Sequence, residues 1–192
     1  VDLAGIRTKD CLSFGFSAVY SLQTVDKLSK FEGEKIAVFK GIAFENANLS
    51  QYKVSNIWYE FKSQLKEKAT FYKTEDQKAP LGLELNINGE VELEKLIKPL
   101  IDAIMSAFCT SNINQDLIKT ISDQTQSSEL CIRELLSDKD TSPLGLHKNL
   151  VHSWSNTIQW NPTDDILDKI RILINSNNTG QVLLDGTLVY LR

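Results

Sequence analysis

The residues best suited to chemistry lie between Glu90 and Asp102, where acidic side chains alternate with lysines. If a helix begins near Glu94, then Glu94, Lys98 and Asp102 fall at positions i, i+4 and i+8 on roughly one face. Carboxylates that converge on one point can hold a divalent cation, and a lysine beside them can stabilise charge on a phosphate. The spacing therefore favours metal-dependent phosphoryl chemistry. The alternative is an ordinary amphipathic helix whose charges lie in water.

The same segment resembles the signature of the RusA-type Holliday-junction resolvases. That signature reads Asp-Leu-Asp-Asn, two apolar residues, Lys, three further residues and Asp-Ala-Leu. The chain matches its spacing with Glu92-Leu93-Glu94-Lys95, Leu96-Ile97, Lys98 and Asp102-Ala103-Ile104. A further acidic residue lies downstream in that family, and Asp116 stands near its place. The resemblance covers residues 34–136.

This resemblance implies a metal-dependent nuclease that cuts structured or branched DNA as a homodimer. Glu92, Glu94 and Asp116 would hold Mg²⁺, Lys98 would stabilise the developing phosphorane charge, and Asp102 would support the cluster. Glutamates replace both aspartates of the signature, and Lys95 replaces its asparagine. A longer side chain displaces a bound metal, and catalytic geometry tolerates little displacement. The resemblance therefore also implies a relative whose activity is weakened or lost.

Two other patterns suggest sites. Glu60-Phe61-Lys62 resembles the Glu-x-Lys of the PD-(D/E)xK nucleases, in which acid and lysine project from one face of a strand, with Glu45 as the upstream acid. The helical spacing of the surrounding apolar residues favours a helix instead. His147 and His152 lie five residues apart, which does not suit two metal ligands on one helix face, so we expect surface or partly buried histidines.

Composition limits the class of protein. No apolar run approaches the roughly 20 residues of a membrane helix, and three cysteines show no C-x-x-C spacing, so we expect a cytoplasmic protein with reduced thiols. The net charge of −4 argues mildly against broad electrostatic attraction to nucleic acid. The competing function is a non-enzymatic protein-protein interaction module. Because Val1 rather than Met comes first, such a module could be a fragment of a larger assembly or defence-type protein.

The elements that must position these residues follow from periodicity. Alternating or β-branched stretches predict strands over 35–44 and 81–87, and a weaker one over 12–20. Apolar residues at three- and four-residue spacing predict helices over 55–72, with Ser55 as N-cap, and over 91–108, where Pro99 either kinks the helix or starts a new one.

The remaining residues predict a C-terminal extension. We expect short helices over 116–121 and 128–136, a linker at 137–143, a helix over 162–174, and a hairpin of 181–184 with 187–191 that turns at Asp185-Gly186. We expect Trp154, Ile158 and Trp160 in the core, and the alternative is an exposed aromatic patch for a partner protein or unstacked bases. The expected fold is of the α+β type of α/β protein, a small mixed sheet with packed helices. The expected domains are residues 1–136 and a C-terminal helix and hairpin at 143–192.

Overall fold

The described part of the chain has an α+β fold, as predicted. The computed structural model describes residues 2–8, 17–23, 31–44, 53–73, 80–154, 157–162, 166–175 and 180–191. In chain order the elements are β1 (Asp2–Thr8), β2 (Ser17–Gln23), β3 (Gly33–Phe44), α1 (Val54–Lys68), β4 (Ala69–Phe71), β5 (Leu81–Asn88), α2 (Leu93–Ala107), β6 (Cys109–Thr110), α3 (Gln115–Thr125), α4 (Glu129–Ser137), β7 (Gly145–Leu146), β8 (Val151–Trp154), β9 (Thr157–Trp160), β10 (Leu167–Asn175) and β11 (Val182–Leu191).

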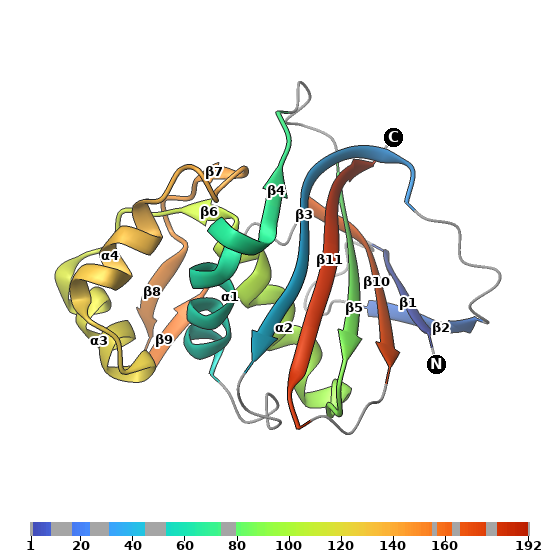
Figure 1. Ribbon diagram of the computed structural model, residues 1–192, viewed down its shortest axis with the longest axis horizontal. Coiled ribbons are helices and arrows are strands. Elements are labelled where there is room, and N and C mark those ends of the chain that lie inside the picture. The colour runs from blue at the N-terminus through green and yellow to red at the C-terminus, as the bar shows by residue number, and fades with distance from the viewer. Residues whose placement is uncertain are drawn as a thin grey trace.

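The main sheet has seven strands in the order β2-β1-β10-β5-β11-β3-β4. β10 and β5 are parallel, whereas β11 runs antiparallel to both β5 and β3. In Figure 1, α1 and α2 lie together on one side of this sheet, and α3, α4 and the short strands lie beyond them. The sheet therefore has one face covered by helices and one face without a helix over it in the described part of the chain.

Buried and partly exposed side chains alternate along the central strand β5. Along β5, Leu81, Leu83, Leu85 and Ile87 are buried, whereas Glu84, Asn86 and Asn88 between them are partly exposed. Such a period-2 pattern places one set of side chains on the helix-covered face and the other on the opposite face. The predicted strands at 35–44 and 81–87 are thus confirmed.

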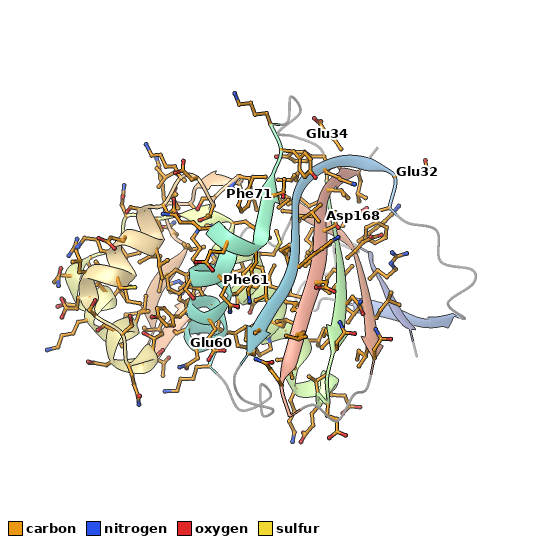
Figure 2. The ribbon with its side chains drawn as sticks, in the orientation of Figure 1. Glu32, Glu34, Glu60, Phe61, Phe71 and Asp168 are labelled. Carbon is orange, nitrogen blue, oxygen red and sulfur yellow. The ribbon has the colours of Figure 1, made fainter. Side chains whose placement is uncertain are left out.

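Aromatic rings join the helices to the sheet. The ring of Phe39 on β3 lies 5.0 Å from that of Phe61 on α1 and 6.1 Å from that of Phe108, which follows α2. Phe71 on β4 lies 6.4 Å from Phe108. Figure 2 shows Phe61 on the side of α1 that faces the sheet. These centroid distances suit edge-to-face aromatic packing, which stabilises the core beyond simple burial.

The predicted helix over 55–72 is shorter than expected at its C-terminal end. α1 ends at Lys68, and the next three residues form β4, which pairs with β3 through Ala37, Val38 and Phe39. Ser55 is not the N-cap, because Lys53 occupies that position. Ser55 is instead buried, and its hydroxyl accepts a hydrogen bond from Nε1 of Trp160 at 3.0 Å.

The helices in the middle of the chain match their predictions. α2 is one helix with Pro99 inside it, so the proline does not start a new helix. α3 contains the short helix expected at 116–121, and α4 matches the one expected at 128–136 except that Ser128 is its N-cap. Ile158 and Trp160 pack against the core, as expected, and the ring of Trp160 lies 5.0 Å from that of Trp58.

The prediction of a helix over 162–174 is wrong. Residues 167–175 form β10, which pairs in parallel with β5 and antiparallel with β1. Ile170, Ile172 and Ile174 alternate along the chain, so this segment also fits the period of a strand. Pairing with β5, which is distant in sequence, decides between the two periods.

The prediction of a hairpin at the end of the chain is also wrong. Residues 182–191 form the single strand β11, and its pairing with β3 shifts register between Leu184 and Gly186. Gly186 lies against Phe39, and a Cβ at this position would come within 2.3 Å of the ring. Asp185 stands opposite two residues of β3, Lys40 and Gly41, so the bulge is in β3, and Gly186 marks a close approach and not a turn.

Residues 137–143, predicted as a linker, are exposed at Ser137, Lys139 and Asp140 but buried at Thr141 and Ser142. Thr141 is 2% exposed and Ser142 is 5% exposed. β10 and β11, whose residues were expected in a C-terminal extension, belong to the main sheet. Of the predicted strand at 12–20, residues 17–20 belong to β2, and residues 12–16 lie outside the described residues. None of the described helices is long and apolar enough to cross a membrane.

Candidate functional site

The predicted metal ligands at the start of α2 lie on the surface. Glu92 is the N-cap residue of α2, and Glu94 lies in its first turn. The positive end of the helix dipole stabilises negative charge at these positions. The Nζ atom of Lys95 lies 2.5 Å from Oε2 of Glu92, and both side chains are more than half exposed. This hydrogen bond raises the pKa of Lys95. Glu92 thus already has a cationic partner in its own helix.

Lys98 and Asp102 are neighbours on one face of α2, as their spacing predicted. Nζ of Lys98 lies 3.0 Å from Oδ1 of Asp102, with the lysine side chain 75% exposed and the aspartate side chain 11% exposed. The aspartate therefore lies at the margin of the core, and the lysine covers it from the solvent side. This pair neutralises the carboxylate that was expected to support a metal cluster.

Asp116 belongs to a different helix. It is exposed in the first turn of α3, whose N-cap Asn114 accepts a hydrogen bond from the backbone N–H of Leu117 at 2.9 Å. Within the described ranges, no three His, Cys, Asp or Glu side chains lie close enough together to hold a metal ion. The structure therefore does not bring Glu92, Glu94 and Asp116 into one metal centre.

The second nuclease-like pattern is contradicted. Glu60 and Lys62 lie on α1 and not on a strand, and Glu45 lies outside the described residues. Lys62 is 2% exposed, so its ammonium cannot reach a substrate in solution. The Glu-x-Lys arrangement of the PD-(D/E)xK nucleases is therefore absent from this segment.

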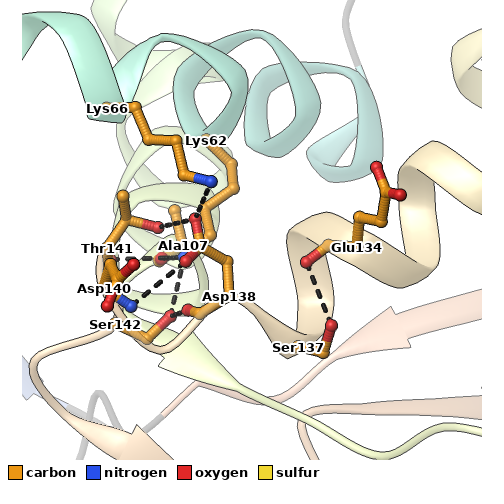
Figure 3. Close-up of polar contacts among 9 residues, drawn as sticks. All are labelled: Lys62, Lys66, Ala107, Glu134, Ser137, Asp138, Asp140, Thr141 and Ser142. Atoms are coloured by element: carbon orange, nitrogen blue, oxygen red, sulfur yellow. Dashed lines mark hydrogen bonds and ion pairs between the residues drawn. The ribbon is translucent and has the colours of Figure 1, made fainter.

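Lys62 is instead the centre of a buried polar cluster (Figure 3). Its ammonium donates hydrogen bonds to the carbonyl oxygens of Ala107 at 2.6 Å and Thr141 at 3.2 Å, and to the hydroxyl of Ser142 at 2.7 Å. Burial lowers the pKa of Lys62 to about 8, against the attraction of the Asp138 carboxylate, which raises it. The cluster joins α1 to the end of α2 and to the loop after α4.

Asp138 holds that loop in shape. Its carboxylate accepts hydrogen bonds from the backbone N–H of Asp140 at 3.1 Å and from the hydroxyl of Thr141 at 3.0 Å, and Lys66 lies 3.5 Å away. Burial raises the pKa of Asp138, but these hydrogen bonds and the nearby lysines outweigh burial and lower it. Sequence reasoning missed this cluster. Its signal is the position of Lys62 on the apolar stripe of α1, between Trp58 and Leu65.

A shallow concavity lies on the face of the sheet opposite α1 and α2. Its volume is about 170 Å³. Its lining comes from the four central strands: Val38, Phe39, Lys40, Glu84, Leu85, Asn86, Arg171, Leu173, Asp185, Gly186 and Thr187. Nη2 of Arg171 lies 2.9 Å from Oε1 of Glu84, and the guanidinium lies 5.8 Å from the ring centroid of Phe31. We name this surface the open face.

The two histidines lie apart from these surfaces. Nε2 of His152 on β8 lies 3.1 Å from Oε1 of Gln159 on β9, which is its partner across that hairpin. The backbone N–H of His147 donates to the carbonyl oxygen of Thr110 at 2.8 Å. Both side chains are partly buried, in agreement with the expectation of ordinary structural histidines.

The chain matches no protein-family model, no curated protein and no solved structure with which it was compared. The resemblance to the RusA-type resolvases therefore depends on the spacing of the residues quoted for it, and it stays a prediction.

Proposed function

We propose that this chain is a non-enzymatic protein-protein interaction module. The observation that carries this proposal is the separation of the expected Mg²⁺ ligands. Glu92 is paired with Lys95, and Asp116 lies in a separate helix. Asp102, expected to support the cluster, is paired with Lys98. A divalent cation at α2 would have to displace ammonium groups that already neutralise these carboxylates.

The open face supports contact with a protein surface. It presents the charged side chains of Lys40 and Asp185 and the amide of Asn86 around a concavity of about 170 Å³. Small-molecule sites usually enclose about 300–1,000 Å³, so this concavity is small for a ligand of that kind. A shallow polar surface that carries charges of both signs suits a protein partner, because the partner can place an opposite charge against each of them.

The test combines metal binding with partner binding. We expect millimolar Mg²⁺ to leave the melting temperature unchanged, because no cation is bound preferentially by the folded state. We expect a Lys40→Glu variant to lose partners that the wild type retains from an extract of its source cells, while Glu67→Ala on the exposed side of α1 retains them. A melting temperature that rises with Mg²⁺, together with identical partner sets for both variants, would overturn the proposal.

A Mg²⁺-dependent nuclease of branched DNA that acts as a homodimer is the second candidate. The spacing along α2 favours it, because Glu94, Lys98 and Asp102 occupy one helix at the i, i+4 and i+8 positions of the RusA-type signature. This candidate predicts Mg²⁺-dependent cleavage of branched DNA that Glu94→Ala abolishes and Glu67→Ala does not. Equal cleavage by both variants, or none by the wild type, removes it. Under both proposals we expect the protein in the cytoplasm.

A further inference from the structure

The register of the strands places two further lysines beside the open face. Val189 on β11 stands opposite Lys35 on β3 and opposite Gly82 on β5. Gly82 in turn stands opposite Lys169 on β10. Residues directly opposite each other in a sheet project from the same side, and so do residues two apart on one strand. Lys35 and Lys169 therefore lie on the same side of the sheet as Glu84 and border the open face.

The acidic residues that line the open face already have partners. Oε1 of Glu84 lies 2.9 Å from Nη2 of Arg171 and accepts a hydrogen bond from the backbone N–H of Phe31 at 2.9 Å. Oδ1 of Asp185 accepts a hydrogen bond from the N–H of Gly41 at 2.6 Å. The negative charges of the open face are therefore matched by groups of the protein itself.

Three lysines on this side of the sheet are not matched in this way. Lys35, Lys40 and Lys169 are exposed, and none of them forms an ion pair or a side-chain hydrogen bond with a residue that the structure describes. Asp168, the extra residue of a bulge in β10, is exposed next to Lys169 and offsets one of the three charges. The open face thus carries an excess of positive charge, although the chain as a whole has a net charge of −4. A complementary partner is acidic.

The spacing of the lysines fits an extended partner better than a small anion. Lys35 and Lys40 are five residues apart on β3, which corresponds to about 16 Å along a strand. Lys169 is three strands away from them in the sheet, a distance of about 14 Å. One small anion would have to draw three long side chains inward, which costs side-chain entropy. An extended chain with several carboxylates can contact each lysine where it lies.

A peptide fits this surface better than a nucleic acid does. Proteins that bind single-stranded nucleic acids usually offer exposed aromatic rings on which the bases stack. At the open face Phe39 is buried, and Phe31 is half-buried, with the guanidinium of Arg171 5.8 Å from its ring centroid. The side chains of Asn86 and Thr187 line the open face and can instead form hydrogen bonds with peptide groups.

We propose that the open face binds an extended acidic segment of a partner protein, whose carboxylates contact Lys35, Lys40 and Lys169. This inference rests on the proposed function and adds the chemistry of the partner. The probe is a fluorescein-labelled oligoglutamate peptide, and its binding to the full chain is followed by fluorescence anisotropy. A labelled single-stranded oligothymidylate with the same number of charges is the competing probe. We expect the wild type to bind oligoglutamate more tightly than oligothymidylate.

A triple variant tests the three lysines. Lys35→Gln, Lys40→Gln and Lys169→Gln together remove the charges and keep most of each side chain. We expect the dissociation constant for oligoglutamate to rise about tenfold, because each exposed ion pair contributes little and three are lost at once. Thermal unfolding checks that the variant is folded. The comparison of the two probes on the wild type needs no variant and decides the question if this one is unfolded.

The matched control makes the same change in net charge elsewhere. Lys53→Gln, Lys119→Gln and Lys148→Gln replace exposed lysines before α1, on α3 and between β7 and β8. This control should bind oligoglutamate within about twofold of the wild type. An equal loss of binding in both triple variants would overturn the inference, and so would tighter binding of oligothymidylate than of oligoglutamate by the wild type.

The proposed function is judged separately by the partners retained from an extract. If Lys40→Glu loses partners while the wild type does not bind oligoglutamate, the proposed function stands and the acidic segment is excluded. If oligoglutamate binds as expected while Lys40→Glu retains every partner and Mg²⁺ raises the melting temperature, the proposed function is overturned and the inference falls with it.

Discussion

The ammonium of Lys62 on α1 lies 2.6 Å from the carbonyl oxygen of Ala107, the last residue of α2. The last carbonyl groups of a helix have no partner within the helix, and they carry the negative end of its dipole. A lysine from a neighbouring helix therefore serves as the C-terminal cap of α2. The same ammonium also binds Thr141 and Ser142, so a single side chain joins three segments.

We expect Lys62→Ala to lower the free energy of unfolding by about 3 kcal/mol, because it opens a cavity and leaves buried acceptors without a donor. Lys66→Ala, on the same helix with its side chain 67% exposed, should cost no more than about 1 kcal/mol. Urea unfolding followed by circular dichroism measures both values. Similar costs for the two lysines would show that the cluster around Lys62 does not stabilise the fold.

Lys62 should also give the protein a distinctive response to alkaline pH. Its pKa is about 8 in the folded protein and near 10.5 when exposed, so unfolding takes up a proton between these values. Stability linked to this group therefore rises from pH 8 to 10.5, by at most about 1.4 kcal/mol per pH unit. We expect the stability of the wild type relative to Lys62→Met to increase over this range in urea titrations. If the difference in stability between the wild type and Lys62→Met stays constant from pH 7 to 10, the lowered pKa of Lys62 is contradicted.

The ion pair between Arg171 and Glu84 should contribute more than the pair between Lys95 and Glu92. The side chains of the first pair are 11% and 18% exposed, whereas those of the second are 69% and 60% exposed. Glu84→Ala leaves a guanidinium in a poorly hydrated site and should cost about 3 kcal/mol. Glu92→Ala should cost less than about 1 kcal/mol. Thermal unfolding of the two variants, compared at low and high salt, provides the measurement.

Gly186 should not tolerate a side chain. An added Cβ would lie 2.3 Å from Cζ of Phe39 and 2.6 Å from the carbonyl oxygen of Glu84, and backbone atoms cannot easily move away. We expect Gly186→Ala to lower the free energy of unfolding by about 2 kcal/mol. Gly180→Ala meets no atoms within 4 Å and carries only the strain of its φ of +71°, so its cost should be smaller. A larger loss of stability for Gly180→Ala than for Gly186→Ala would refute the close approach of Gly186 to Phe39.

Local periodicity predicted the elements whose apolar residues fit only one period, wherever their partners lie in the sequence. The stripe of α2, the alternation of β5 and the β-branched residues of β3 each indicate one structure only. The segment containing Ile170, Ile172 and Ile174 fits both periods, and its assignment needed the distant strand β5, where Ile170 pairs with Leu83. The same limit applied to the site. The spacing placed Lys98 beside Asp102, but the separation of Asp116 from Glu94 depends on where α3 lies, and α3 packs against α1 and α4.

β11 lies between β3 and β5, yet it begins only at Val182, whereas β5 ends at Asn88. β3 and β5 therefore cannot complete their hydrogen bonding as they emerge from the ribosome. One edge of each strand stays unpaired until β11 has been synthesised. Closing so long a loop delays folding. A nascent chain that stalls before residue 182 would present two unfilled strands, which makes it a natural substrate for chaperones and for aggregation.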